Sequence, residues 1–266
     1  MSKQDGAPES LDGLKRLLEV MRRLRDPASG CPWDLAQDSR SLARYALEEA
    51  YEVVSAIESG SNVALRDELG DLLFQVVFHA QLGAEQGNFN FNEVATGIAS
   101  KLTHRHPHVF GHAGIGDNSH WESIKADERA ARGATGALDD VPLALPALMR
   151  ATKLGKRAAV VGFDWPDESG PHAKVLEELA EVEAARQGAA GSTVEDELGD
   201  LLLAVTSYAR HLKVDPETAL RRANTRFEQR FRAMEQLALH RGLQLAKLAP
   251  EALDQLWEAV KKGVQS

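Results

Sequence analysis

Apolar residues recur along this 266-residue chain at intervals of three and four, the spacing of one face of an α-helix. The first stripe occupies positions 11, 14, 17, 18, 21 and 24 and ends before the proline at position 27. These stripes and their capping residues predict helices at 11–24, 41–57, 63–82, 93 onward, 120–131, 148–160, 173–185, 194–212, 216–240 and 250–262. A convincing alternating strand pattern is absent from the sequence. The pattern therefore predicts an all-α protein.

The predicted helix at 63–82 is apolar on most sides after Asp71. A helix that is apolar nearly all round is usually buried. We therefore expect its aliphatic side chains to form core, namely Leu69, Leu72, Leu73, Val76 and Val77.

The chain also repeats itself. Residues 67–73 recur unchanged as residues 196–202, and 196 − 67 gives an offset of 129. The motif Leu-Glu-Glu-x-x-Glu at 47–52 recurs at 176–181 with the same offset. Two motifs at one offset are not a chance match, so the chain consists of two copies of one unit.

Weaker counterparts flank these motifs. They are Lys101 and Arg105 with Arg226 and Arg230, Trp121 and Lys125 with Trp257 and Lys261, and Cys31-Pro32-Trp33-Asp34 with Gly162-Phe163-Asp164-Trp165. A stretch rich in alanine and glycine, with prolines at 142 and 146, separates the halves. We predict an N-terminal domain at 1–131, a linker at 132–145 and a C-terminal domain at 146–266.

Acidic residues in each half form a pattern that suits a cation. Glu49 and Glu52 lie three apart on one predicted helix, which places them on one face, and Glu68 and Asp71 have the same spacing on the next. The short connection at 59–62 predicts an antiparallel helix pair, so the four carboxylates should surround one point. Such an all-oxygen set suits Mg²⁺, or Mn²⁺ in its place. The second half offers the equivalent set Glu178, Glu181, Glu197 and Asp200.

Solvated helix faces are the plainer explanation of a single such pair, because glutamate is common on helices. The recurrence of both pairs, with 15 residues between them in each half, favours a metal site. Glu48 and Glu177 stand at the edge of the same faces. The four histidines between 104 and 112 have no counterparts in the second half, which favours a structural loop there over a zinc site.

Composition narrows the function further. The chain is 43% hydrophobic and 27% charged, with a net charge of −9, which argues against nucleic-acid binding. One cysteine rules out an internal disulfide and a cysteine-rich zinc site. The absence of a long apolar run or signal core argues against a membrane protein and favours the cytoplasm.

These motifs resemble the MazG family of all-α nucleoside triphosphate pyrophosphohydrolases. The resemblance rests on the two carboxylate pairs at 49–52 and 68–71, on Gly30-Cys31-Pro32-Trp33-Asp34, on Leu47-Glu48-Glu49-Ala50-Tyr51-Glu52, and on His106-Pro107-His108-Val109-Phe110-Gly111. It covers the chain from about Leu11 to Lys262 and points to the tandem-domain bacterial members, with two helical-bundle domains.

The resemblance implies hydrolysis of ribo- and deoxyribonucleoside triphosphates to monophosphate and pyrophosphate, a Mg²⁺ requirement, a homodimer, and a role in clearing unwanted nucleotides or in stress signalling. It implies that the four carboxylates of each half hold the metal, and that Glu48 and Glu177 hold a second metal or orient the water. It also implies nucleotide contacts from Lys174, Arg226, Arg230, Trp257 and Lys261, and from the first-half counterparts Lys101, Arg105, Trp121 and Lys125.

Several alternatives stay open at this point. A nucleotide sensor or interaction module, and a specialised pyrophosphohydrolase for dUTP or phosphoribosyl-ATP, would use the same helical plan. The halves also differ, because Tyr45 occupies the position that matches Lys174. The sequence does not define the base preference, the half that turns over substrate, or whether the halves pair within one chain or between chains.

Overall fold

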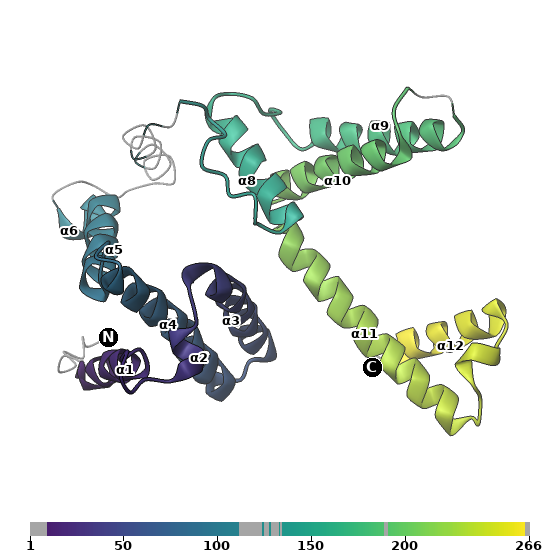
Figure 1. The fold of residues 1–266 in the computed structure, drawn as a ribbon. Coiled ribbons are helices and arrows are strands. Elements are labelled where there is room, and N and C mark those ends of the chain that lie inside the picture. Colours follow the sequence, from purple (N-terminus) through teal and green to yellow (C-terminus); the bar gives the residue numbers. More distant parts are fainter. Residues whose placement is uncertain are drawn as a thin grey trace, which may run out of the picture. The chain divides into compact units, whose positions relative to one another are not determined.

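The computed structural model describes residues 10–111, 124, 128, 133, 135–188 and 191–263, and this part of the chain contains helices and no strand (Figure 1). The predicted all-α class is therefore confirmed. The chain divides into two compact units, Met1–Trp121 and Glu122–Ser266. Within the described residues, no helix combines the length and apolarity that a membrane span requires. The exact limits of the linker stay a prediction.

The first unit is built around a helix hairpin. Its helices are α1 (Asp12–Leu24), α2 (Pro32–Leu35), α3 (Ser39–Ser59), α4 (Asn62–Glu85), α5 (Phe91–Arg105) and α6 (Pro107–Phe110). The Asp38 side chain caps α3 by accepting hydrogen bonds from the backbone of Arg40 and Ser41. Gly60 ends α3 in the left-handed conformation with φ of 72°, and Ser61 caps α4 directly afterwards. This short turn folds α4 back along α3 (Figure 1).

The core of the first unit lies around the C-terminal half of α4. The buried side chains are Met21, Leu42, Val77, Phe78 and Leu82, so α1, α3 and α4 all contribute. The N-terminal half of α4 is different, and the predicted burial there is wrong. Leu69 is 48% exposed and Leu73 39%, while Leu72 is half-buried, and Val76, just beyond this half, is 40% exposed. In this unit α3 covers one side of that half, whereas α1 packs near the other end of the helix.

The second unit repeats the hairpin. Its elements are α8 (Ala147–Val160), α9 (Ser169–Arg186), α10 (Val194–His211), α11 (Pro216–His240), the 3₁₀ helix η1 (Leu245–Lys247) and α12 (Pro250–Gly263). Thr193 caps α10 through a reciprocal pair of hydrogen bonds with Asp196. The α9–α10 hairpin corresponds to α3–α4, and α8 packs against α10. A further hairpin, α11–α12, has its own core around Met234 and Leu256.

The predicted long helices agree with the observed ones to within a few residues. The short helices α2, α6 and η1 were not predicted, because three or four residues are too few to show a helical period. The predicted helix at 120–131 lies largely outside the described residues.

Candidate functional site

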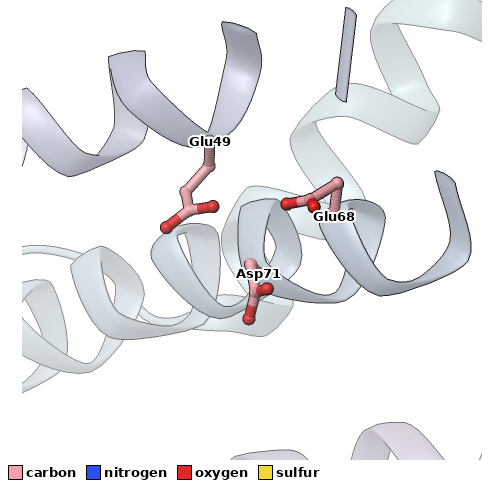
Figure 2. Close-up of side chains that lie close together, drawn as sticks. All are labelled: Glu49, Glu68 and Asp71. Atoms are coloured by element: carbon pink, nitrogen blue, oxygen red, sulfur yellow. The ribbon is translucent and has the colours of Figure 1, made fainter. Parts of the chain in front are cut away.

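Carboxylates from the two helices of the first hairpin gather at one place. Glu49 comes from α3, whereas Glu68 and Asp71 come from α4, and Figure 2 shows the three side chains close together. One carboxylate oxygen of each lies within 4.8 Å of one oxygen of the other two. Glu52 lies outside this group of three, although its carboxyl lies against Glu68.

Negative charges lie close together in this cluster and raise the pKa of two of its carboxyls. Burial raises the pKa of Glu49, and the negative charges of Asp71, Glu52, Glu68 and Glu48 raise it further. The pKa of Glu68 is also raised, first by burial and then by the neighbouring Glu52. Carboxylates that resist ionisation because of their like-charged neighbours are stabilised by a bound cation.

The second hairpin holds the equivalent cluster and buries it more deeply. Glu178 on α9 meets Glu197 and Asp200 on α10, with one oxygen of each within 4.8 Å of the others. Glu178 is 4% exposed and Glu197 is 8% exposed. The Oε2 atom of Glu178 has no hydrogen-bond partner among the described residues. Glu181, the fourth predicted ligand, lies outside this group of three, and its pKa is raised by burial and by the neighbouring Glu178 carboxyl.

Two further side chains contact the second cluster. Lys174 Nζ lies 2.7 Å from Glu177 Oε1 and 2.6 Å from Glu178 Oε1, and these bonds raise the lysine pKa well above its ordinary range. The Ser192 hydroxyl donates to Glu197 Oε1. Ser192 was not predicted, because Val63 stands at the matching position and the repeat gave no signal.

An apolar pocket of about 530 Å³ opens beside this cluster, between α8, α9 and α10. Lys174, Glu178 and Asp200 contribute to its lining. Its apolar lining includes Phe163, Trp165 and Leu203. The second half therefore joins a carboxylate cluster to a space large enough for part of a small molecule.

An ion pair borders the pocket. Asp164 accepts hydrogen bonds from Arg210, with Nη1 at 2.7 Å from Oδ2, and its Oδ1 lies 2.9 Å from His211 Nε2. The Arg210 guanidinium, followed by His211, holds the pKa of Asp164 far below its usual range. This pair fixes the 162–165 loop onto α10, so the observed contacts of Asp164 are structural. Arg210 was missed because the matching position in the first half is Gln81.

The first-half motif Gly30-Cys31-Pro32-Trp33-Asp34 is structural in a similar way. It forms the short helix α2, in which Asp34 is 7% exposed. Arg25 donates to the backbone carbonyl oxygen of Asp34 and pairs with Glu85 on α4. The Trp33 ring packs edge-on against Tyr45, with ring centroids 6.3 Å apart.

The predicted nucleotide contacts lie on other helices. Arg226 and Arg230 are on α11, whereas Trp257 and Lys261 are on α12, and none of the four lines the pocket beside the carboxylates. Trp257 packs against Phe227, with ring centroids 5.4 Å apart, and Lys261 pairs with Glu258 at 2.6 Å.

Lys101 and Arg105 lie near the end of α5, and Trp121 and Lys125 lie outside the described residues. Among the predicted nucleotide contacts that the structure describes, Lys174 is therefore the one that contacts a carboxylate cluster of its own chain.

The histidine segment contains local contacts. His106 Nδ1 lies 2.7 Å from the Leu102 carbonyl oxygen, and the rings of His106 and His108 are 5.6 Å apart. Among the described residues, no histidine belongs to a group arranged to hold a metal ion. His112 lies outside the described residues.

Comparison with known proteins agrees with this arrangement. A family model described as "MazG nucleotide pyrophosphohydrolase domain" matches residues 37–110, which contain the first carboxylate cluster. The "Nucleoside triphosphate pyrophosphohydrolase" of Escherichia coli strain K12 is 46% identical over 258 residues, which cover 95% of this chain and 98% of that protein. The chain belongs to the MazG family.

Other MazG relatives are also similar over most of the chain. The "Nucleoside triphosphate pyrophosphohydrolase/pyrophosphatase MazG" of Thermotoga maritima is 41% identical over 249 residues, covering 94% of this chain and 96% of that protein. The "Nucleoside triphosphate pyrophosphohydrolase" of Mycolicibacterium smegmatis is 34% identical over 226 residues, 76% of this chain and 69% of that one. The similarity to the Escherichia coli and Thermotoga maritima proteins therefore extends over both halves of the chain.

Proposed function

We propose that this MazG-family chain hydrolyses ribo- and deoxyribonucleoside triphosphates to the monophosphate and pyrophosphate in a Mg²⁺-dependent reaction. The observation that carries the proposal is the buried Glu178 carboxylate, whose Oε2 lacks a hydrogen-bond partner among the described residues and which lies beside Glu197 and Asp200. Leaving one oxygen of a buried carboxylate without a partner is costly, and a hard cation offsets that cost. The names of the similar proteins support the substrate and the reaction.

The donor set fits Mg²⁺ or Mn²⁺, because every candidate ligand is a carboxylate oxygen. The residues that would hold the metal are Glu49, Glu52, Glu68 and Asp71 in the first half, and Glu178, Glu181, Glu197 and Asp200 in the second. Bound Mg²⁺ supplies positive charge against the phosphates and makes a coordinated water more acidic.

Glu48 and Glu177 are suited to orient the attacking water and accept its proton. Both are exposed and sit next to a metal-ligand candidate, at the edge of their cluster. Water oxygen would form a bond to the α-phosphorus, while the bond from that phosphorus to the bridging oxygen breaks and pyrophosphate leaves. The contact of Lys174 with Glu178 supports a role for this lysine in binding the triphosphate.

The repeated apolar stripes support a homodimer. Leu69, Leu73 and Val76 are exposed on α4, and the residues 129 positions later on α10 are exposed as well: Leu198 by 45%, Leu202 by 55% and Val205 by 42%. An apolar stripe on a helix is stable when another helix covers it.

We propose that a second copy of this chain covers these stripes. The partner's α11–α12 hairpin could then supply the Arg226, Arg230, Trp257 and Lys261 contacts that one chain does not bring to the carboxylates. In the same way, Lys101, Arg105, Trp121 and Lys125 of the first half would supply nucleotide contacts to a carboxylate cluster of the partner chain.

We further propose a role in clearing unwanted nucleotides or in stress-linked regulation. A cytoplasmic location and the absence of nucleic-acid partners stay predictions from the sequence.

The test is to incubate the purified protein with each of the eight common nucleoside triphosphates and Mg²⁺ and to identify the products by chromatography. The paired variants Glu49→Ala/Glu52→Ala and Glu178→Ala/Glu181→Ala are run alongside. Monophosphate with pyrophosphate, lost in one paired variant, supports the proposal and names the working half. Diphosphate with phosphate contradicts it. A folded protein that binds Mg²⁺ but turns over none of the eight favours a nucleotide sensor or a specialised substrate.

A further inference from the structure

The two carboxylate clusters carry the same acidic residues and differ in the cation that contacts them. Each half brings five carboxylates, Glu48 and Glu49 with their partners in the first, and Glu177 and Glu178 with theirs in the second. The second half adds the Lys174 ammonium, whereas the matching position in the first half is Tyr45. Lys174 lies one helical turn before Glu178 on α9, so both side chains project from the same face.

The contacts of Lys174 place its charge inside the cluster. Its Nζ lies 2.6 Å from Glu178 Oε1, while Glu178 Oε2 is the oxygen without a hydrogen-bond partner among the described residues. One oxygen of this ligand is therefore committed to an ammonium ion and the other is left for a metal. The second contact, to Glu177 at 2.7 Å, extends the same positive charge to the neighbouring carboxylate.

Tyr45 provides no such charge. Its ring packs against the core of the first unit and edge-on against Trp33. Its hydroxyl accepts a hydrogen bond from Arg44 Nη2 at 2.6 Å, and that guanidinium lies over the tyrosine ring. The side chains whose charges act on Glu49 are all acidic: Asp71, Glu52, Glu68 and Glu48.

We propose that Lys174 is a built-in counter-cation of the second cluster, which lowers its affinity for divalent cations and makes the first cluster the tighter metal site in the absence of nucleotide. The inference rests on the proposed function insofar as both clusters bind metal. A cation that enters the second cluster is attracted by the carboxylates but repelled by the ammonium beside them. In the first cluster the carboxylates attract the metal without that opposition.

The experiment measures Mn²⁺ binding without nucleotide, by titration calorimetry and by the electron paramagnetic resonance signal of free Mn²⁺. The first site is disabled by Glu49→Gln/Glu68→Gln, so that the second site is measured by itself. In this background, Lys174→Met should tighten Mn²⁺ binding roughly tenfold, and Lys174→Arg should leave it near the parent value, because it keeps the charge. Lys262→Met removes the same charge from the exposed end of α12 and should change the affinity less than about twofold.

The reciprocal arm uses a second background, in which Glu178→Gln/Glu197→Gln disables the second site. Tyr45→Lys should weaken Mn²⁺ binding at the first site roughly tenfold, whereas Tyr45→Met controls for the loss of the ring and should not. Circular dichroism confirms that each variant is folded.

The experiment distinguishes failure of the inference about Lys174 from failure of the proposed metal requirement. If Lys174→Met leaves the second-site affinity unchanged or weakens it, the lysine does not oppose the metal and the inference is overturned, while the proposed metal sites stand. If the wild-type protein binds no Mn²⁺ at all, both the inference and the metal requirement of the proposed function are overturned.

Discussion

The Lys174 ammonium lies 2.6 Å from a carboxylate oxygen of Glu178 in the second half, where the first half has a tyrosine near Glu49. Two hairpins with the same carboxylate motifs therefore differ in charge at their centres. Two clusters with unequal local charge can bind metal with unequal affinity.

Removing one ligand from each half should abolish most activity. Glu49→Gln/Glu178→Gln keeps the side-chain shapes but removes one negative ligand per cluster. We expect kcat/KM to fall by at least about 100-fold, because even outer-shell partners of metal ligands are worth 10- to 100-fold. Pyrophosphate release with saturating Mg²⁺ is the measurement. Glu235→Gln, exposed on α11, is the matched control. A double variant that keeps more than a tenth of wild-type activity would exclude these residues as ligands.

In the metal-free protein, the contribution of Glu49 to stability should fall as the pH rises. The pKa of Glu49 is raised above its ordinary value of 4.5 by burial and by neighbouring carboxylates, so the folded state binds this proton more tightly than the unfolded chain. The stability from that proton is fully present below pH 4.5 and is lost as the pH rises through the raised pKa.

Thermal melts with a chelator test this sign. From about pH 4.5 upward, the Tm of Glu49→Gln should rise relative to wild type, and saturating Mg²⁺ should remove that advantage. Glu235→Gln should show no such trend. If the difference in Tm between Glu49→Gln and wild type is the same at every pH, ionisation of Glu49 does not destabilise the folded state.

Breaking the ion pair beside the pocket should destabilise the second unit. The Arg210 and Asp164 side chains are 14% and 22% exposed, so Arg210→Met leaves a largely buried carboxylate without its main partner. We expect a loss of about 1–3 kcal/mol in the free energy of unfolding, measured by urea denaturation.

Arg186→Met is the control for that measurement, because Arg186 pairs with Glu183 on an exposed face of the same unit. It should cause no measurable change. Equal effects of the two variants would show that the pocket-side pair has no special structural role.

Charging the repeated stripe should weaken self-association. Leu73→Lys/Leu202→Lys introduces one charge on each exposed apolar stripe, without touching a carboxylate. We expect a shift from dimer toward monomer in light scattering coupled to size exclusion. Leu143→Lys makes the same change at a residue that is 83% exposed outside the hairpins, and it should leave the mass unchanged. A wild-type protein that is already monomeric would contradict the proposed dimer.

Much of the fold could be predicted from the pattern of apolar residues and from the internal repeat. Apolar periodicity predicted the long helices, and the offset between residues 67–73 and 196–202 predicted two hairpins of the same kind. The burial of side chains on α4 was not predicted correctly. Periodicity indicates that Leu73 and Val76 lie on an apolar face that needs a packing partner, but it does not indicate which segment or chain covers that face.

The site was predictable only in part. Helical spacing predicted that Glu49 would meet Asp71, and the same rule applies to Glu178 and Asp200. It gave no signal for Ser192 or Arg210, because each contacts its partner through a loop or across helices and has no counterpart in the other half. Pairings between distant segments become visible only in the folded chain.

The most direct test of the central claim is hydrolysis of a nucleoside triphosphate in ¹⁸O-enriched water with Mg²⁺, with both products analysed by mass spectrometry. The account predicts a monophosphate that carries one ¹⁸O atom and a pyrophosphate that carries none, because water attacks the α-phosphorus. Label in the pyrophosphate, or release of diphosphate and labelled phosphate, would contradict it.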